Sequence, residues 1–480
     1  MAEAAFDFDL VVLGAGSAGL GLSLFMSRAG LRVLLIDKTP ADVGGDCLNH
    51  GCVPSKAFIH AARQVHGARQ AARFGLAAPG PADLGRVMDY VRERQDAIRR
   101  HENPAYLRGL GIVVETGTPR FVGPHEIEVN GRTHRGRKIV VATGSRPRQL
   151  AVPGAESVDL YDNQRVWALR QLPQRLLVVG GGPNGVELAQ AMQRLGAQVT
   201  VVHTGPRLLE KEDPRISAVL LERLRAEGIT FHLAAEVAAF SGPHEAQVRP
   251  KDGGAPAVAV PFDLAYVAIG RTVGFGGLQL DRAGVDVDEH GHIRLNEHLQ
   301  TTNPDVYVAG DAANSYKFSH AAELHVRLLL FNFFSPLKKK LDYDHFSWVT
   351  FTDPEVAHFG LDEAELTRRG LRYERWETDF ADDDRAVVDD YRYGRLLLFV
   401  EKPRLPGRKR RLLGGAMVAP GAGELVQELI LANASGLGVD AIFDKIYPYP
   451  VAARINQELI IRQRDISPLL RKALGLAYKL

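Results

Sequence analysis

The sequence predicts an α/β fold that contains two similar nucleotide-binding units and a C-terminal α+β domain of a different texture. A pattern of strand, glycine-rich turn, helix and second strand occurs near the N-terminus, over residues 10–37, and occurs again over residues 176–202. From about residue 344, helical and strand-like segments alternate without a further glycine pattern. A chain of 480 residues is also too long for one hydrophobic core, which favours several domains.

The first unit begins with the apolar run 10–13, which we expect to be a strand that leads into a turn with the pattern Gly-x-Gly-x-x-Gly. A helical pattern follows to Ala29, and a second expected strand, 33–36, ends on an acid. Such glycines let the backbone approach a pyrophosphate, the helix N-terminus attracts it, and the acid accepts hydrogen bonds from ribose. The candidate ligands of this dinucleotide are Gly14, Gly16, Gly19, Asp37 and the neighbouring Lys38.

The second unit repeats this order, with an apolar strand over 176–179, a glycine-rich turn, a helix to Leu195 and a strand over 199–202. Two such units are expected to bind two nucleotides, which indicates flavin adenine dinucleotide (FAD) in one and a nicotinamide dinucleotide in the other. The candidate ligands of the nicotinamide dinucleotide are Gly180, Gly182 and Gly185.

The end of the second unit's last strand bears on the choice of nicotinamide dinucleotide. NAD-specific folds place an acid there, but this chain has His203 and, four residues later, Arg207. Both side chains are cationic candidates for binding a 2′-phosphate, so NADPH is predicted and NADH stays possible. The alternative is that Arg207 only pairs with a nearby acid such as Glu210.

The two cysteines of the chain lie in one short segment, Gly44-Gly45-Asp46-Cys47-Leu48-Asn49-His50-Gly51-Cys52-Val53-Pro54-Ser55-Lys56. A Cys-x4-Cys pair at the start of a helix is exposed to the positive helix end, which favours thiolate. Two inert buried cysteines are the alternative, and a structural zinc site would need four ligands. We predict that Cys47 and Cys52 form a redox-active disulfide, and we predict no metal site.

The bulk composition excludes several classes of protein. Lys and Arg number 59 against 57 Asp and Glu, so no overall charge points to nucleic acid. No apolar stretch approaches the roughly 18 residues of a membrane span, and the N-terminus does not have the pattern of a signal peptide. We therefore expect a cytoplasmic protein, in which a disulfide is catalytic or sensing rather than structural.

Together these residues resemble the flavoprotein disulfide reductases, the family of glutathione reductase, dihydrolipoyl dehydrogenase and mercuric reductase. The resemblance covers nearly the whole chain. The segments 45–49 and 446–450 are most similar to the mercuric-reductase-like branch. The matching segments are 14–19, 44–56, 142–144, 180–187, 308–312, 318–322 and 351–355.

The resemblance implies an FAD-dependent NAD(P)H oxidoreductase. In this family Cys52 corresponds to the thiol beside the flavin, and Cys47 to the exposed thiol that meets the acceptor. Lys56, four residues after Cys52, corresponds to the cation that stabilises reduced flavin. Its family partner is Glu187, and the residue that holds the ribityl chain is Asp311. The further residues implied are Gly45, Thr143, Gly144 and Ala312 for FAD, and Glu187 and Gly270 for NAD(P).

The resemblance also implies the domain order and a homodimer. We expect an FAD-binding domain over 1–155 and 275–343, an NAD(P)-binding domain over 156–274 and a dimerisation domain over 344–480. The last domain should end in a helix over 455–480 with basic residues, and 403–411 should be a surface hairpin loop. In the homodimer the C-terminal segment completes the partner's active site, which places Tyr449 near Cys47 of the other subunit.

The chain departs from its family where glutathione and dihydrolipoyl enzymes carry His-Pro-Thr-x-x-Glu, because it has Tyr449-Pro450-Val451-Ala452-Ala453-Arg454. The pKa of tyrosine is ordinarily near 10 and that of histidine about 6.5, so the base form is scarce at neutral pH. A positioned base contributes about 10²–10⁴ in rate, so slow reduction of small disulfides is predicted. Mercuric reductases use a further C-terminal cysteine pair, which a chain with two cysteines lacks.

The acceptor therefore stays open between a metal ion, a quinone and a protein disulfide. His50 lies three residues after Cys47, so on a helix the two would share a face, and an imidazole there could replace the missing base. A position on the solvent or flavin side is the favoured alternative for His50. One alternative function is an orthodox dihydrolipoyl or glutathione-type reductase with such a base. Another is a redox-sensing flavoprotein without efficient turnover.

Overall fold

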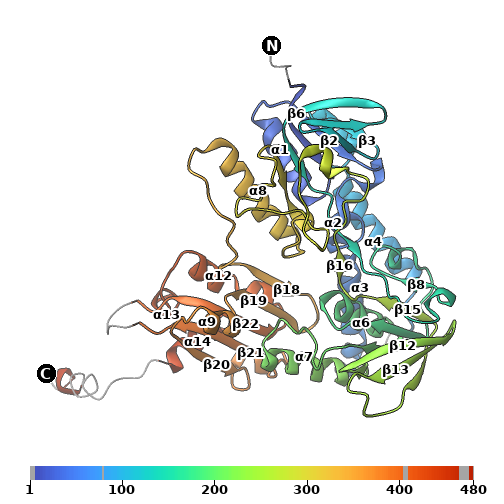
Figure 1. Cartoon of the computed structure of the whole chain (residues 1–480). Coiled ribbons are helices and arrows are strands. Elements are labelled where there is room, and N and C mark those ends of the chain that lie inside the picture. Colours follow the sequence, from blue (N-terminus) through green and yellow to red (C-terminus); the bar gives the residue numbers. More distant parts are fainter. Residues whose placement is uncertain (1–5, 78–79, 404–408, 464–474, 479–480) are drawn as a thin grey trace. The chain divides into compact units, whose positions relative to one another are not determined.

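The computed structural model of the chain describes residues 6–77, 80–403, 409–463 and 475–478 (Figure 1). The chain divides into two compact units, one of Met1–Thr204 with Ala235–Leu341 and the other of Gly205–Ala234 with Asp342–Leu480. Most of the expected loop 403–411 lies outside the described residues. The same holds for four basic residues of the expected C-terminal helix, Arg464, Arg471, Lys472 and Lys479. The predicted α/β class is confirmed, and the predicted domain boundaries stay a prediction.

The first unit contains most of the strands and the longest helices. Its strands are β1 (Phe8–Leu13), β2 (Val33–Asp37), β3 (Val113–Thr116), β4 (Arg120–Gly123), β5 (Glu126–Val129), β6 (Arg132–Val141), β7 (Arg146–Pro147), β8 (Leu160–Tyr161), β9 (Arg175–Val179), β10 (Gln198–Val202), β12 (Ala235–Gly242), β13 (Glu245–Pro250), β14 (Val258–Pro261), β15 (Leu264–Val267), β16 (Arg271–Thr272) and β17 (Val306–Val308). Its helices are α1 (Ser17–Arg28), α2 (Gly45–Asn49), α3 (Cys52–Gln70), α4 (Leu84–Arg99), α5 (Pro104–Gly109), α6 (Pro183–Leu195) and α8 (Ser319–Phe334).

The second unit contains an antiparallel sheet and shorter helices. Its strands are β11 (Thr230–His232), β18 (Ser347–Thr350), β19 (Glu355–Gly360), β20 (Tyr373–Asp379), β21 (Arg395–Glu401) and β22 (Leu412–Ala419). Its helices are α7 (Pro214–Ala226), α9 (Glu363–Arg368), α10 (Asp384–Val388), α11 (Ala422–Leu425), α12 (Gln427–Ala434), α13 (Asp440–Phe443) and α14 (Arg454–Arg462). In the parts of the chain that the structure describes, no helix is both long and apolar enough to cross a membrane.

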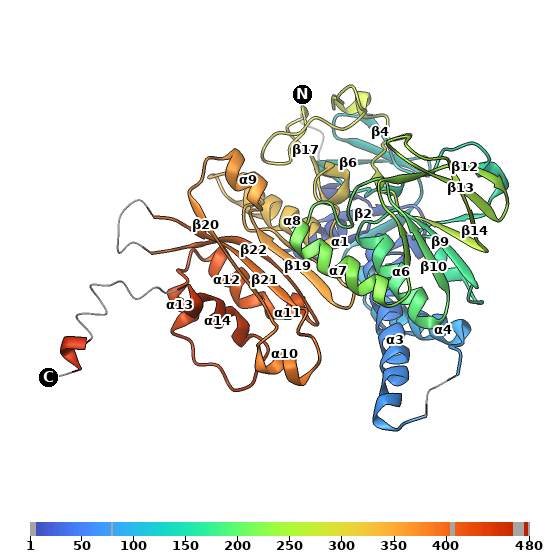
Figure 2. The same cartoon turned by 90° about the horizontal axis from the view of Figure 1, so that it is seen from below.

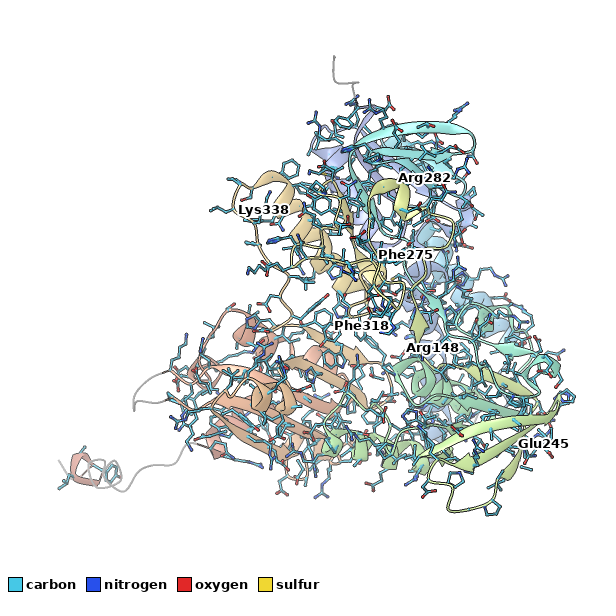
Figure 3. The ribbon with its side chains drawn as sticks, viewed as in Figure 1. Arg148, Glu245, Phe275, Arg282, Phe318 and Lys338 are labelled. Atoms are coloured by element: carbon cyan, nitrogen blue, oxygen red, sulfur yellow. The ribbon has the colours of Figure 1, made fainter. Side chains whose placement is uncertain are left out.

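A parallel core runs through the main sheet of the first unit, whose order is β3-β2-β1-β6-β5-β4 with β17 paired to β6. Strands β1, β2 and β6 are apolar at successive positions because both of their faces are covered. Leu10 and Val12 of β1 face residues of α1 and α8, whereas Val11 and Leu13 face the core that contains Phe121. The side chains that fill this unit are drawn in Figure 3, where Phe318 marks the residue before α8.

The second nucleotide-binding sheet of this unit places β10, β9, β15 and β8 side by side in that order, with parallel pairings. Helix α6 follows β9 through the turn at 180–182, as α1 follows β1 through the turn at 14–16. Both turns lie at the carboxyl ends of their central strands, where open α/β sheets bind ligands. The repeated pattern of the sequence is therefore present as two strand–turn–helix arrangements in one unit.

The second unit is a five-stranded antiparallel sheet, β18-β19-β22-β21-β20, with helices on its faces (Figure 2). Along β21, Leu396 and Leu398 pack in the core that includes residues of α12 and α14. Leu397 and Phe399 point to the other face, where they meet Leu366 of α9. Successive side chains of a strand alternate between faces, so β21 is apolar from Leu396 to Val400 because both faces are covered.

Candidate active site

The two cysteines lie at a break between two helices of the first unit. Cys47 is in the short helix α2, and Cys52 is the first residue of α3. Gly44, in a left-handed conformation with φ 96°, precedes α2. Both cysteines are free thiols in the structure, and Cys52 Sγ lies 3.3 Å from the Ser319 hydroxyl at the start of α8.

The two thiols differ in their acidity. A hydrogen bond from Cys47 lowers the pKa of Cys52, and the Ser319 hydroxyl and the positive charge of Lys56 add to this effect. The same hydrogen bond to Cys52 raises the pKa of Cys47, as does burial. At neutral pH the pair therefore holds one proton on Cys47, with Cys52 as the thiolate.

The two thiols also differ in their surroundings. In the single chain, Cys52 is exposed and Cys47 is half-buried. Cys47 lies within its short helix and lines a cavity. The roles that the resemblance implies, with Cys52 beside the flavin and Cys47 as the thiol that meets the acceptor, stay predictions.

An ion pair lies one helical turn beyond Cys52. Lys56 Nζ donates to Glu187 Oε2 at 2.9 Å, and the Glu187 side chain, on α6, is almost completely buried. Helices α3 and α6 pack together, so the pairing joins the cysteine-bearing segment to the second nucleotide-binding sheet. The partner that the resemblance implied for Lys56 is thus in contact with it, and their catalytic roles stay predictions.

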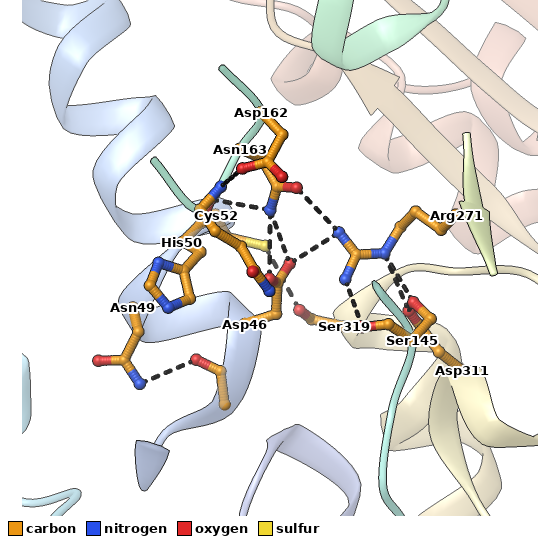
Figure 4. A network of polar contacts seen from close by, with 12 residues as sticks. Asp46, Asn49, His50, Cys52, Ser145, Asp162, Asn163, Arg271, Asp311 and Ser319 are labelled. Carbon is orange, nitrogen blue, oxygen red and sulfur yellow. Dashed lines mark hydrogen bonds and ion pairs between the residues drawn. The ribbon is translucent and has the colours of Figure 1, made fainter. Parts of the chain in front are cut away.

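A network of polar contacts surrounds the residue before Cys47 (Figure 4). Arg271 Nη1 lies 3.2 Å from Asp46 Oδ2, and Arg271 Nε lies 3.7 Å from Asp311 Oδ2. The guanidinium is 13% exposed, so it compensates two carboxylates in a largely buried position. Burial raises the pKa of Asp311, while hydrogen bonding to Ser145 and the charge of Arg271 counteract this shift.

Neutral groups complete this network. Ser145 Oγ donates to Asp311 Oδ2 at 2.5 Å and accepts from Arg271 Nε at 2.6 Å. Asn163 Nδ2 donates to Asp46 Oδ1 at 3.2 Å and to the backbone carbonyl of His50. The network therefore links the cysteine segment to Asp311, the predicted ribityl ligand, through hydrogen bonds within one unit.

His50 lies outside the helix that carries Cys47. Helix α2 ends at Asn49, and His50 has the non-helical dihedral angles φ −139° and ψ −8°. His50 therefore does not continue the helical face of Cys47, and Figure 4 shows its ring turned away from the Cys52 sulfur. Its backbone carbonyl accepts a hydrogen bond from Trp167 Nε1 at 3.0 Å. A base role for His50 stays a prediction without the geometry that motivated it.

The glycines of the first turn fit a bound dinucleotide. A Cβ on Gly19 would lie 1.8 Å from the Gly14 carbonyl oxygen, so only glycine permits this close approach of helix and strand. A Cβ on Gly45 would lie 2.5 Å from Gly16 Cα, so the redox segment packs directly on the turn. Asp37, at the end of β2, accepts from the backbone N–H of Ala15 at 2.6 Å. These residues fit FAD.

The other residues predicted for FAD lie in the same unit. Lys38 and Thr143 are exposed, Gly144 has a φ of 72°, and Ala312 is buried at the start of the segment that follows β17. Gly144 and Ala312 flank the positions of Ser145 and Asp311 in the network of Figure 4. Their contacts with FAD stay predictions.

The second glycine turn has the same construction. A Cβ on Gly185 would lie 2.0 Å from the Gly180 carbonyl oxygen, while Gly182 and Gly270 face open space. His203 Nδ1 accepts from the Gly181 N–H at 3.1 Å, so this nitrogen is unprotonated and the ring supports the turn. Arg207, which belongs to the other compact unit, donates to the Glu210 backbone carbonyl rather than to its carboxylate.

Tyr449 lies in the second unit, on the segment before α14. It is 69% exposed, and its hydroxyl donates to Asp384 Oδ2 at 3.0 Å. That hydrogen bond and the charge of Asp384 raise the pKa of the phenol. Arg454, the first residue of α14, pairs with Glu458 at 3.2 Å. A phenol with a raised pKa is protonated at neutral pH and is a poor general base.

The fold and the site together define a flavoprotein oxidoreductase with two nucleotide-binding sheets and a thiol pair. The model of the pyridine nucleotide-disulphide oxidoreductase family matches residues 8–325, and the model of its dimerisation domain matches residues 346–459. The chain belongs to this family, which makes it an FAD-dependent enzyme that uses a pyridine nucleotide.

Two relatives and one solved structure show this similarity over nearly the whole chain. The chain is 33% identical over 451 residues to a dihydrolipoyl dehydrogenase from Thermus scotoductus, covering 92% of this chain and 94% of the relative. It is 32% identical over 456 residues to a mercuric reductase from Streptomyces lividans, covering 94% of each. The HOCl-induced flavoprotein disulfide reductase RclA from Escherichia coli has the same fold, with a TM-score of 0.83 at 24% identity, over 95% of this chain and 100% of that one.

Proposed function

We propose that the chain takes hydride from NADPH, that FAD transfers the two electrons to the Cys47–Cys52 disulfide, and that the dithiol reduces an acceptor other than a common small disulfide. The acceptor is a metal ion, a quinone or a protein disulfide. The NADPH preference is supported by the lack of an acid after β10, where His203 follows Val202.

One observation carries this proposal, namely the asymmetric thiol pair beside the Lys56–Glu187 ion pair. The thiol with the lowered pKa, Cys52, starts the helix that also carries Lys56. Lys56 is fixed by the buried Glu187, so its charge is held one turn from the reactive sulfur. Two inert buried cysteines would not need a cation or an exposed thiolate in this position.

Three further residues have roles in the proposed reaction. Cys47 carries the proton of the reduced pair and is the sulfur that we propose meets the acceptor. Ser319 stabilises the Cys52 thiolate through its hydroxyl. Arg271 holds Asp46 and Asp311 and thereby fixes the segment on which Cys47 lies.

The match to the dimerisation domain supports a homodimer, in which Tyr449 of the partner would approach Cys47. We propose that this residue shapes the acceptor site rather than moving protons. The cytoplasm stays the predicted location. The orthodox disulfide reductase and the redox sensor without turnover are the competing functions.

Anaerobic titration of the FAD-loaded protein with NADPH tests the proposal. The expected product is a two-electron-reduced form that absorbs at long wavelength, because the Cys52 thiolate then lies against the flavin. Titration with NADH under the same conditions measures the preference between the two nucleotides. A protein that NADPH does not reduce would contradict the proposed enzyme and favour the redox-sensing alternative.

Replacing Tyr449 by phenylalanine is expected to change kcat for acceptor reduction by no more than about twofold between pH 6 and pH 8. The pKa of the Tyr449 phenol is raised above its ordinary value of 10, so the hydroxyl stays protonated over this pH range. The phenol therefore cannot accept a proton as a base there, and its removal should have little effect on the rate. Steady-state kinetics with NADPH measure the effect. A tenfold loss of kcat that varies with pH would show that Tyr449 does act as a base.

A further inference from the structure

A small cavity is lined in part by Cys47. Its volume is about 190 Å³, and most of its wall is apolar. Two titratable side chains are among its described lining residues, the Cys47 thiol and the Glu102 carboxyl. The lining residues are Ser17, Leu20, Gly44, Cys47, Leu48, Val53, Ile98 and Glu102.

The position of Glu102 follows from how α4 is attached to the redox segment. Gln95 Nε2 donates to the backbone carbonyls of Leu48 and Asn49, at 2.9 and 3.0 Å. Helix α4 ends at Arg99, and Glu102 follows three residues later, in the bend that leads away from the helix. The Glu102 N–H donates to the Arg99 carbonyl, so this bend stays attached to the end of α4. Glu102 Oε2 lies 3.0 Å from where a Cβ on Gly44 would be, which places the carboxyl beside the residue that precedes α2.

The surroundings of Glu102 suit proton exchange. In the described chain no cation or hydrogen-bond donor is paired with its carboxyl, and the nearby Arg99 is bound to Asp96 and Asn49. Burial raises the pKa of Glu102 above its ordinary value of 4.5. The negative charge of Glu102 is also one of the causes that raise the pKa of Cys47, so the two groups interact.

We propose that Glu102 exchanges protons with Cys47 of the same subunit during acceptor reduction. Glu102 would then take the place of the C-terminal histidine of the family, where this chain has Tyr449. The inference rests on the proposed function. Cys47 holds the proton of the reduced pair and must lose it to become a nucleophile. Glu102 is the ionisable group that shares the cavity with this thiol.

A disulfide R–S–S–R would be reduced by the Cys47–Cys52 pair through two thiol–disulfide exchanges. Cys47 gives its proton to the Glu102 carboxylate, and its sulfur attacks one sulfur of the acceptor, which forms Cys47–S–S–R and releases RS⁻. The protonated Glu102 gives the proton to this leaving group to yield RSH. The Cys52 thiolate then attacks the Cys47 sulfur, which forms the Cys47–Cys52 disulfide and releases a second RS⁻. Two electrons pass from the dithiol to the acceptor.

The test uses the FAD-loaded enzyme, its variant Glu102→Gln and the small neutral probe 2-hydroxyethyl disulfide. Each protein is reduced either with NADPH or with dithiothreitol that is then removed, and the rate of reoxidation by the probe is measured from pH 5 to pH 9. Glu102→Gln is expected to lower the rate about 100-fold at pH 7. The wild-type rate should fall at acid pH because Glu102 gains its proton and because the Cys52 thiolate, whose pKa is about 6, is also protonated there. The Glu102→Gln variant should keep only the part of the fall that comes from Cys52, which the reduced protein reports separately through its long-wavelength absorbance.

The outcomes separate a proton-transfer role from an electrostatic one. If Glu102 only raises the pKa of Cys47 through its charge, Glu102→Gln makes the thiolate easier to form, and an unchanged or faster reaction overturns the proposal. Glu102→Asp, which keeps the carboxyl, should retain at least tenfold more activity than Glu102→Gln. If Glu102→Gln does not fold, the absence of an acid limb in the wild-type and Glu102→Asp profiles overturns the proposal.

A control variant and the two reductants keep the remaining explanations apart. Glu93→Gln changes an exposed acid of α4 that pairs with Arg94, and it should react at the wild-type rate. Failure of NADPH to reduce the wild-type protein contradicts the proposed function. The protein reduced with dithiothreitol still reports on Glu102, so the two hypotheses are distinguishable.

Discussion

Replacement of Cys47 by serine is expected to abolish acceptor reduction, with a loss of at least about 10³-fold, while the flavin is still reduced by NADPH. Serine cannot form a bond to Cys52 or to the acceptor, because its hydroxyl is neither oxidised nor nucleophilic under these conditions. Stopped-flow measurement of flavin reduction and steady-state assay of acceptor reduction separate the two half-reactions.

The matched variant Cys52→Ser addresses the other thiol. It is expected to remove the long-wavelength absorbance of the reduced enzyme, because the thiolate with the lowered pKa is Cys52. A quinone acceptor needs neither thiol, since it can take electrons from the flavin directly. Wild-type turnover of the true acceptor by both serine variants would show that the thiol pair is not used, and the prediction of a redox-active disulfide would be wrong.

Those parts of the fold that depend on local sequence could be predicted. The turn at Gly14–Gly19 requires glycine at positions where a Cβ would collide with backbone, so its sequence pattern is specific to one structure. Strands β1 and β9 were also predictable, because a strand that is covered on both faces is apolar at successive positions and does not alternate between apolar and polar residues. The antiparallel C-terminal unit was predicted from a change of texture alone, and its strand order could not be.

The site was only partly predictable because several of its contacts join residues far apart in the chain. Arg271 and Asn163 meet Asp46 across more than 100 residues, and no local pattern marks either of them. Arg271 follows directly after the predicted Gly270, which was the only available signal. Glu102 was missed for the same reason, since its relation to Cys47 arises from the packing of α4 on α2.

The expectation that His50 shares a helix face with Cys47 does not hold, whereas the base role of His50 stays a prediction. Three residues of separation place two side chains on one face only if the helix continues through both, and α2 ends at Asn49. Gly51, which separates the two helices, was already visible in the sequence as a residue that weakens a helix.

Replacement of Arg271 by methionine is expected to destabilise the FAD-loaded protein by about 2 kcal/mol, because it leaves the mostly buried Asp311 and the partly exposed Asp46 without their shared cation. Thermal unfolding of wild type and variant measures the loss as a lower Tm. The control Arg294→Met removes an exposed arginine from the same unit and should shift Tm by no more than about 1 °C.

The effect of Arg271→Met should also depend on pH, with a sign that follows from Asp311. The pKa of this carboxyl is raised in the folded protein, so its contribution to stability is complete below the ordinary value of 3.8 and is lost as pH rises through the folded pKa. Arg271 limits this loss by lowering the pKa of Asp311, so the variant should lose more stability at pH 7.5 than at pH 5.

The double variant Asp46→Asn/Arg271→Met identifies which carboxylate is responsible. If the uncompensated charge of Asp46 contributes, the double variant recovers part of the Tm that the single variant loses, and the coupling can be read from a double-mutant cycle. The part that is not recovered belongs to Asp311 and should carry the pH dependence. An equal loss of Tm at pH 5 and pH 7.5 would show that Arg271 acts through packing and not through its charge.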